Sequence, residues 1–329
     1  MSVPVDASPA RAGAAQTYQA LVVWGAYGDL VAHLTHRGSV FQQFDDASIQ
    51  LFRHCITAVS FGTDLQRLGL QLAKAEPDQI AVRVREAAVL CGRDWFEAVF
   101  KALDASAQIE WLVEEGARMT ADSIVCRIEA DGRQLLSAER PALNFLQLLS
   151  GTASATRRHV RAIEGASPNP KGCAILDTRK TLPGRRQAQK YAVRVGGGQN
   201  QRLALWHGIL IKENHIAAAG GVTQALRNAQ ALQSGVDIQI EVESLSQLHE
   251  ALSAGASSVL LDNFTLDAMR QAVAINQQYQ QGACLLEVSG SVQLEQLRDI
   301  AATGVDRISI GALTKDVKAT DFSMRFEDL

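Results

Sequence analysis

The sequence predicts an α/β protein, an incomplete TIM-like (β/α) barrel of parallel strands preceded by an α+β sandwich domain. Beyond Pro141, six short apolar runs of β type each precede a segment with helical spacing, and their starts lie 20 to 35 residues apart. Polar residues fall at the C-terminal end of every run, as they do where barrel strands converge on one mouth. An open doubly wound sheet, which would gather them at one switch point, is the less favoured alternative.

The region before the barrel shows a mixture of α and β patterns. An amphipathic segment near Trp95–Leu103 predicts a helix, and the Asp131-Gly132 turn signal predicts a β-hairpin over residues 123–137. The N-terminus is rich in Ala, Pro, Ser and Gly without periodicity. The expected division is a flexible tail over 1–17, an α+β domain over 18–140 joined by the C-terminal residues 313–329, and a catalytic α/β barrel over 141–312.

The barrel repeats carry recognisable helix signals. Ser244 with Gln247 fits a capping box, and two helical segments end in Gly255 and Gly304, which favour the left-handed conformation that stops a helix. The strand runs are CAILDT (173–178), GILIKE (208–213), IQIEVE (238–243), SVLLDN (258–263), CLLEVS (284–289) and RISIGA (307–312).

Composition restricts the class of protein. The 329 residues are 47% hydrophobic and 20% charged, which suits a folded chain with two cores. No run reaches the roughly 20 apolar residues of a membrane span, so a cytoplasmic protein without membrane contact is expected. Five scattered cysteines suggest neither a zinc site nor disulfides, and a net charge of −3 argues against nucleic-acid binding.

The balance of charge inverts along the chain. Between Arg140 and Lys212 there are thirteen Lys and Arg against two acids, whereas between Glu213 and Arg270 there are seven acids against two bases. If both segments line one cleft, the cleft would hold a highly anionic small ligand on one side and a divalent cation on the other.

Seven segments carry a resemblance to a known family, in order and at matching spacing. They are ERPALNFLQLLSG (139–151), LDTRKTLPG (176–184), YAVRVGGGQNQR (191–202), LIKENHI (210–216), LLDNF (260–264), LEVSGS (286–291) and ISIGALTK (308–315). This set resembles the quinolinate phosphoribosyltransferase family over roughly residues 85 to 326. The resemblance implies a pentosyltransferase that makes nicotinate mononucleotide, CO2 and pyrophosphate from quinolinate and phosphoribosyl pyrophosphate in NAD biosynthesis, with Mg²⁺ and no organic cofactor.

The resemblance assigns the basic residues to quinolinate, whose two adjacent carboxylates suit planar guanidinium groups. Any one of these cations would ordinarily be a solvated surface charge, but here several adjoin strand ends. Arg140 is expected to enter the site from a neighbouring subunit, which implies a homodimer or a higher homo-oligomer. The implied substrate-binding set in this part of the chain is Arg140, Thr178, Arg179, Lys180, Gln201, Arg202 and Lys212.

The resemblance places an acidic pair near the ribose and its magnesium. Glu241 and Asp262 end successive strands, and two carboxylates together with substrate phosphates and water suit Mg²⁺. The same carboxylates would stabilise positive charge on the ribose as pyrophosphate departs, and Glu243 is a neighbouring candidate. Lys180 and Lys212 are the candidates for proton transfer or charge stabilisation during the reaction.

The last two strands are expected to bind the 5-phosphate through backbone N–H groups, as barrels commonly do. The turn after each strand supplies small residues that let a phosphate approach the backbone. The implied phosphate-binding residues are Ser289, Gly290, Ser291, Gly311 and Ala312.

The chain departs from the family pattern in two places. The family usually reads Asn-His-Arg where this chain has Asn200-Gln201-Arg202, so a protonated imidazole is lost there, and usually Asp where this chain has His207. His215 follows the pattern and is expected beside the site. The family usually has Glu-Asp followed by Gly-Asp-x-Thr near its N-terminus. In this chain the most similar segment is Gly62-Thr63-Asp64.

Two rival hypotheses remain open on the sequence. One is a phosphoribosyltransferase that uses another aromatic acid as acceptor. Release of CO2 with quinolinate as the acceptor would exclude it, whereas turnover of nicotinate without CO2 release would favour it. The other is a catalytically silent paralogue that binds dicarboxylate or phosphorylated ligands, motivated by Gln201 and His207.

Overall fold

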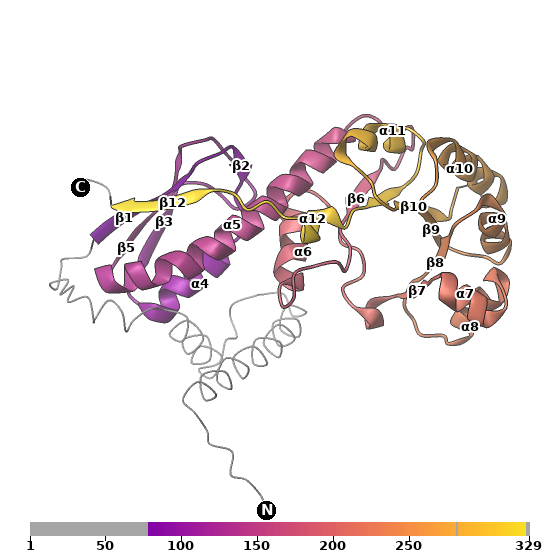
Figure 1. The fold of residues 1–329 in the computed structure, drawn as a ribbon, viewed down its shortest axis with the longest axis horizontal. Coiled ribbons are helices and arrows are strands. Elements are labelled where there is room, and N and C mark those ends of the chain that lie inside the picture. The colour runs from indigo at the N-terminus through magenta and orange to yellow at the C-terminus, as the bar shows by residue number, and fades with distance from the viewer. Residues whose placement is uncertain (1–77, 281, 327–329) are drawn as a thin grey trace, which may run out of the picture.

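The computed structural model describes residues 78–280 and 282–326, in which two sheets with their helices lie at opposite ends of the long axis (Figure 1). One sheet is antiparallel and the other is parallel. The predicted fold class, a parallel barrel-like unit with a separate α+β unit, is confirmed. The predicted tail over 1–17 and the Gly62–Asp64 segment lie outside the described residues.

The antiparallel sheet has the strand order β12-β1-β5-β3. Helices α4 (Arg93–Leu103) and α5 (Gly132–Ala162) pack their apolar sides against it, and Phe96, Phe100 and Leu143 are among the largest buried side chains of this core. The strands are β1 (Asp78–Val84), β3 (Gln108–Trp111), β5 (Ile124–Ala130) and β12 (Phe322–Phe326), with a small pair formed by β2 (Ala88–Val89) and β4 (Arg118–Met119).

The hairpin predicted over residues 123–137 is wrong. Strand β5 ends at Ala130, and α5 begins at Gly132 and continues for 31 residues. Asp131 accepts a hydrogen bond at Oδ1 from the backbone N–H of Gln134 at 3.3 Å, which satisfies one of the free donors at the start of the helix. The Asp-Gly pair therefore starts a helix instead of turning a strand, and the predicted domain boundary at 140/141 falls inside α5.

The parallel sheet has six strands in the order β6-β11-β10-β9-β8-β7. Its strands are β6 (Ala174–Leu176), β7 (Ile209–Ile211), β8 (Ile238–Val242), β9 (Ser258–Asp262), β10 (Leu285–Ser289) and β11 (Arg307–Ser309), all within the six predicted runs. Its helices are α6 (Arg186–Val195), η2 (Leu205–His207), α7 (Glu213–Ala219), α8 (Val222–Ala231), α9 (Leu245–Ser253), α10 (Leu266–Gln280), η3 (Leu294–Gln296), α11 (Leu297–Ala301) and α12 (Ala312–Lys315). Ser244 caps α9 as predicted.

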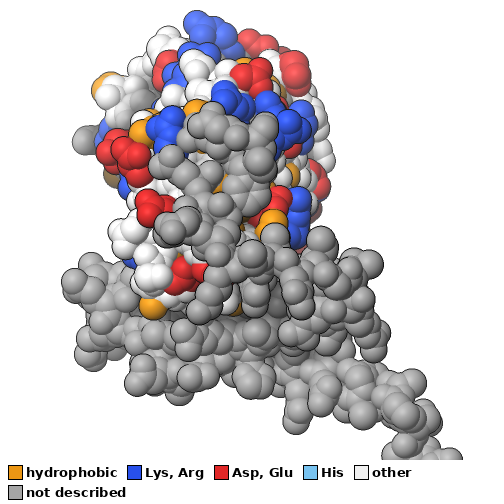
Figure 2. Space-filling model, turned by 90° about the vertical axis from the view of Figure 1, so that its left-hand side faces the viewer, with side chains coloured by type: hydrophobic (Ala, Val, Ile, Leu, Met, Phe, Trp, Pro, Cys, Tyr) orange, Lys and Arg blue, Asp and Glu red, His pale blue; other side chains and the backbone are white. Residues whose placement is uncertain are grey.

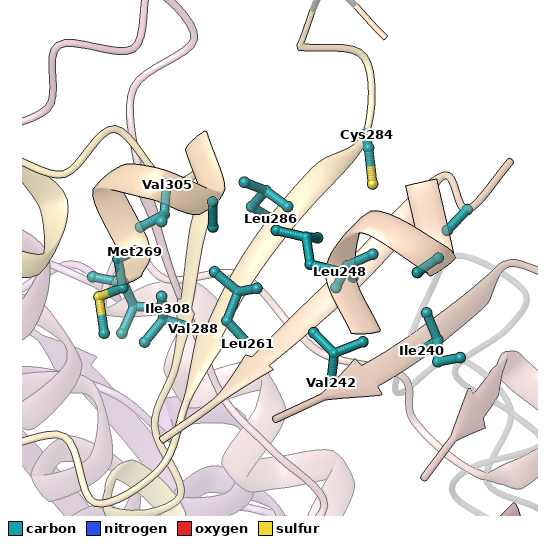
Figure 3. Close-up of a cluster of buried hydrophobic side chains, with 14 of the residues drawn as sticks. Ile240, Val242, Leu248, Leu261, Met269, Cys284, Leu286, Val288, Val305 and Ile308 are labelled. Atoms are coloured by element: carbon teal, nitrogen blue, oxygen red, sulfur yellow. The ribbon is translucent and has the colours of Figure 1, made fainter. Parts of the chain in front are cut away.

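Alternate residues of each barrel strand face different surroundings. Side chains such as Ile240, Leu261 and Val288 pack against the covering helices in one buried apolar cluster (Figure 3). Their neighbours along the strands, including Glu241 and Glu287, therefore face the other side of the curved sheet. The apolar face holds the helices in place, and the opposite face is left to carry polar groups.

The C-terminal segment crosses back over α5 to reach the antiparallel sheet. The crossing lies at Gly151, where a Cβ atom would collide with the backbone carbonyl of Lys318. After this crossing, Thr320 donates its backbone N–H to the carbonyl of Gln147, and β12 then pairs with β1. The close approach thus requires a residue without a side chain in the middle of α5.

The described surface carries both charged and apolar side chains, and Leu205, Trp206 and Leu232 are among its exposed large hydrophobic residues. Lys, Arg, Asp and Glu side chains are interspersed on the face at the antiparallel-sheet end (Figure 2). None of the described helices combines the length and apolar character that crossing a bilayer requires.

Candidate active site

The predicted site residues of the barrel lie at one edge of the parallel sheet. Because all six strands run in the same direction, their C-terminal ends share this edge. In strand order the edge carries Thr178, Arg179 and Lys180 after β6, Gly311 and Ala312 after β11, Ser289, Gly290 and Ser291 at β10, Asp262 at β9, Glu241 at β8 and Lys212 after β7. The structure brings these residues to one mouth, and their roles toward substrate stay predictions.

The basic side of the mouth holds three cations. In the described part of the chain, Arg179, Lys180 and Arg202 form no ion pair with a carboxylate. Burial lowers the pKa of Arg202, and the charge of Arg179 lowers it further, so the two guanidinium groups lie close enough to repel each other. Such repulsion is relieved when an anion binds between them.

Arg186 and Thr314 position the loop that bears these cations. Arg186 donates from Nη2 to the carbonyl of Arg179 at 3.2 Å and from Nη1 to the carbonyl of Leu203 at 3.4 Å, which joins the loop after β6 to the segment around Arg202. Thr314 donates from Oγ1 to the carbonyl of Lys180 at 2.8 Å. The loop after β6 is therefore held by α6 on one side and α12 on the other.

The acidic side of the mouth lies on neighbouring strands. Lys212 pairs with Glu241 at 3.3 Å between Nζ and Oε2, and the Glu241 side chain is only 12% exposed. Burial raises the pKa of Glu241, Lys212 opposes the shift, and Asp262 adds to it, which places the two carboxylates within electrostatic reach of each other. Asp262 also accepts a hydrogen bond from Nδ2 of Asn263 at 2.9 Å.

These two carboxylates test the predicted magnesium site. The described residues contain no group of three or more His, Cys, Asp or Glu side chains that could hold a metal ion. Two hard oxygen donors fit Mg²⁺ only where substrate phosphates and water complete its octahedron, which is the mode it commonly uses. Glu241 and Asp262 thus fit an ion that arrives with a phosphorylated substrate, and Glu243 is exposed at the end of the same strand.

The turn after β10 depends on glycine. Gly290 has φ +129°, and a Cβ atom there would lie 2.6 Å from Oδ1 of Asn263. Asn263 itself adopts φ +55° and donates its backbone N–H to the carbonyl of Ser289 at 3.2 Å. This packing leaves backbone groups at the predicted phosphate position accessible without a side chain between them.

The sequence reasoning missed a buried ion pair beneath the basic loop. Lys190 donates to Asp177 at 2.5 Å, and the two side chains are 3% and 0% exposed. Asp177 also accepts from Nδ2 of Asn200 at 2.6 Å and from the backbone N–H of Gln201 at 2.8 Å. Lys190 lies on α6 within a run that otherwise reads as an ordinary amphipathic helix, so the sequence gives no signal that its ammonium group is buried.

The structure also places four other residues that the sequence analysis named. His215 accepts the backbone N–H of Lys212 at Nδ1 and so caps α7 beside the site, while exposed His207 accepts the backbone N–H of Leu203. Arg140 lies on α5 with its side chain 66% exposed, and it pairs with Glu139 at 3.8 Å. No described contact joins Arg140 to the barrel mouth. The side chain of Gln201 forms hydrogen bonds with Glu287 and Gln239 inside the barrel.

Comparison with known proteins decides the family. Residues 66–150 match the N-terminal domain and residues 152–325 the C-terminal domain of the family described as quinolinate phosphoribosyl transferase. The chain belongs to the quinolinate phosphoribosyl transferase family. It is therefore an enzyme, a pentosyltransferase, and the predicted family and reaction are confirmed over the rival hypotheses.

Relatives of this quinolinate phosphoribosyl transferase cover most of its length. A carboxylating nicotinate-nucleotide pyrophosphorylase of Mycobacterium leprae is 42% identical over 66% of this chain and 74% of its own, and that of Homo sapiens is 36% identical over 76% and 83%. Among solved structures, a nicotinate-nucleotide pyrophosphorylase from Francisella tularensis superposes with a TM-score of 0.77 at 39% identity, covering 87% of this chain and 98% of the other.

Proposed function

We propose that this chain transfers the phosphoribosyl group of 5-phosphoribosyl 1-pyrophosphate to the ring nitrogen of quinolinate, and that loss of CO2 then yields nicotinate mononucleotide for NAD biosynthesis. One observation carries the proposal. Arg179 and Lys180 share a strand edge with the neighbouring carboxylates Glu241 and Asp262, Arg202 lies close to Arg179, and none of these three cations forms an ion pair with a carboxylate of the described residues. A dicarboxylate and a sugar pyrophosphate with its metal ion are the ligands that complement such an arrangement.

The cations bind and orient quinolinate. Guanidinium groups of Arg179 and Arg202 form charge-assisted hydrogen bonds to its two adjacent carboxylates, and their mutual repulsion falls when this anion enters. Lys180 and Lys212 supply further positive charge at the two sides of the mouth. Substrate held in this way presents its ring nitrogen toward the carboxylates across the sheet edge, which lowers the entropic part of the barrier.

The carboxylates act on the sugar. Glu241 and Asp262 would hold Mg²⁺ through oxygen atoms, partly through substrate and water, and the bound ion would neutralise charge on the departing pyrophosphate. Positive charge grows at ribose C1 as the bond to pyrophosphate breaks, and the two nearby carboxylates stabilise it. The ring nitrogen then forms the new bond to C1, so no covalent intermediate with the protein is required.

Decarboxylation follows from the charge on the ring. Once its nitrogen is alkylated, the pyridinium accepts the electron pair of the bond between C2 and the departing CO2, and a proton then replaces the carboxyl group at C2. Lys180 and Lys212 are the nearby groups that can stabilise this step. Backbone N–H groups around Gly290 and Gly311 hold the 5-phosphate.

The assembly and the setting form part of the proposal. Arg140 is exposed on α5 and reaches no barrel residue of its own chain by a described contact, which favours its use in the site of a second copy. A homodimer, or a higher oligomer built from such pairs, would then carry complete sites. We place the enzyme in the cytoplasm, where its phosphorylated substrate and product are retained.

The decisive experiment incubates the purified protein with phosphoribosyl pyrophosphate, magnesium and either quinolinate or nicotinate. We expect CO2 and pyrophosphate from quinolinate in equal amounts, and no turnover when magnesium is removed by chelation. Nicotinate turnover without quinolinate turnover would reassign the acceptor. Ligand binding without pyrophosphate release at any magnesium concentration would identify a silent paralogue.

A further inference from the structure

The side chain of Gln201 is occupied by hydrogen bonds within the protein. Its Nε2 donates to Oε1 of Glu287 at 2.6 Å and to Oε1 of Gln239 at 3.1 Å. Its Oε1 accepts the backbone N–H of Arg202 at 2.9 Å. A primary amide has two N–H donors, so Gln201 has no donor left for a ligand in this arrangement.

The acceptors of Gln201 belong to a buried polar layer inside the barrel. Glu287 on β10 is fully buried, and its second carboxylate oxygen accepts Nε2 of Gln239 on β8 at 3.0 Å. Arg307 on β11 lies 3.9 Å from Glu287 and donates to Oγ of Ser258 on β9 at 3.3 Å. The layer therefore connects four adjacent strands on the side opposite the apolar cluster. Hydrogen bonds among Gln201, Gln239 and Glu287 hold it together, whereas Nε of Arg307 has no hydrogen-bond partner among the described residues.

The backbone of Gln201 is fastened to the other edge of the sheet. Asp177 accepts its N–H at 2.8 Å, and Lys190 donates to its carbonyl at 2.8 Å. The preceding Gln199 forms a parallel bridge with Leu176 of β6. The segment 199–202 thus lies beside β6, while the Gln201 side chain reaches across the barrel interior to β8 and β10.

We propose that Gln201 is a positioning residue of quinolinate binding, which fixes Arg202 by tying its backbone to the buried polar layer and does not itself contact the substrate. This inference rests on the proposed function and revises the predicted role of Gln201 as a substrate ligand. Arg202 follows Gln201 directly, and its only side-chain hydrogen bond within the described residues runs from Nη1 to the carbonyl of Gly208 at 2.9 Å. Its guanidinium orientation consequently depends on where residues 199–202 are held.

The proposal predicts that the layer can be perturbed without touching the mouth. Gln201→Leu and Gln239→Leu each remove the bond between segment 199–202 and β8, and we expect both to raise KM for quinolinate about tenfold to a hundredfold, the range of one to two lost hydrogen bonds near a charge. KM for phosphoribosyl pyrophosphate and kcat should change about threefold or less. Gln224→Leu, which removes an exposed amide bonded to Asn228 on α8, is the matched control and should match the wild type.

A histidine at position 201 gives a readout that simple destabilisation would not move. A neutral imidazole can donate to one acceptor and an imidazolium to two, so Gln201→His should bind quinolinate more tightly as pH falls from about 8 to 6, relative to the wild type at each pH. The wild-type amide does not titrate. The charged groups around position 201 are Asp177, Lys190, Arg202, Glu287 and Arg307, and Glu241 lies on the same face of β8 as Gln239. Both proteins contain these groups, so dividing the quinolinate affinity of Gln201→His by that of the wild type at each pH removes the effect of their titration.

The measurements are steady-state kinetics and calorimetric titration of quinolinate, with thermal melting of every variant. If Gln201→Leu raises KM but Gln239→Leu does not, Gln201 contacts the substrate directly and the inference is overturned. It is also overturned if both variants match the wild type. Should the leucine variants melt before assay, a flat ratio of Gln201→His to wild type between about pH 8 and 6 still rejects the inference. A wild type that neither binds nor converts quinolinate rejects the proposed function instead.

Discussion

Replacing Lys190 by methionine tests the buried ion pair beneath the basic loop. The change keeps the apolar stem but removes the ammonium group that contacts Asp177, whose side chain is 0% exposed. Breaking a buried pair by removing one partner costs about 3–5 kcal/mol, because the remaining charge is left without a counter-ion. We therefore expect Lys190→Met to lower the free energy of unfolding by that amount and Tm by roughly 6–20 °C.

The assay is equilibrium denaturation and thermal melting, with two comparison variants. Lys315→Met removes an exposed lysine that pairs with Asp316, and should cost less than about 1 kcal/mol. Adding Asp177→Asn to Lys190→Met removes the orphaned charge, so the double variant should be more stable than the single one. The reasoning would be refuted if the free energy of unfolding of Lys190→Met lay within about 1 kcal/mol of the wild-type value. It would also be refuted if the double variant were no more stable than Lys190→Met.

Three further predictions concern the mouth of the barrel. Arg179→Ala and Arg202→Ala should each raise KM for quinolinate about tenfold to a hundredfold, since each removes charge-assisted bonds of about 1.5–3 kcal/mol, and an unchanged KM would exclude the residue from the site. Asp262→Asn should abolish magnesium-dependent turnover while the melting curve stays that of a folded protein; full activity would remove Asp262 from the mechanism. Because burial raises the pKa of Glu241 and Lys212 opposes that shift, the acid limb of kcat/KM should lie above the ordinary glutamate pKa of about 4.3, and Lys212→Met should move the limb to higher pH; a limb that stays in place or moves down would contradict this.

The barrel could be predicted because its signals are local. Each strand is a short apolar run, two helical segments end at the predicted stop residues Gly255 and Gly304, and Ser244 caps α9 as its capping box predicts. Residues at strand ends could be placed together for the same reason, since parallel strands bring their C-terminal ends to one edge. The positions of Lys212, Glu241 and Asp262 at the ends of successive strands therefore predicted that they lie close together, although no contact between them was known.

Contacts between distant segments were beyond the same reasoning. Asp131-Gly132 is as compatible with a hairpin as with a helix start, and the choice depends on how α5 packs against the sheet. The burial of Lys190 depends on Asp177, 13 residues earlier and on another element. The proposed role of Gln201 likewise depends on Glu287, which lies 86 residues away. From the sequence alone, the change from the family's usual histidine to glutamine indicated only that an imidazole was lost.

The returning C-terminal segment has a practical consequence for anyone dividing this enzyme. The family match assigns residues 152–325 to the C-terminal domain, yet its last strand completes the sheet of the other domain after passing over Gly151. A barrel fragment that begins at residue 152 would contain β12 without its partner strand, so the backbone groups of β12 would be unpaired. The N-terminal fragment would contain β1 with one edge unpaired. A separable half would have to stop before the crossing, and the N-terminal half would need the missing strand supplied by a linker.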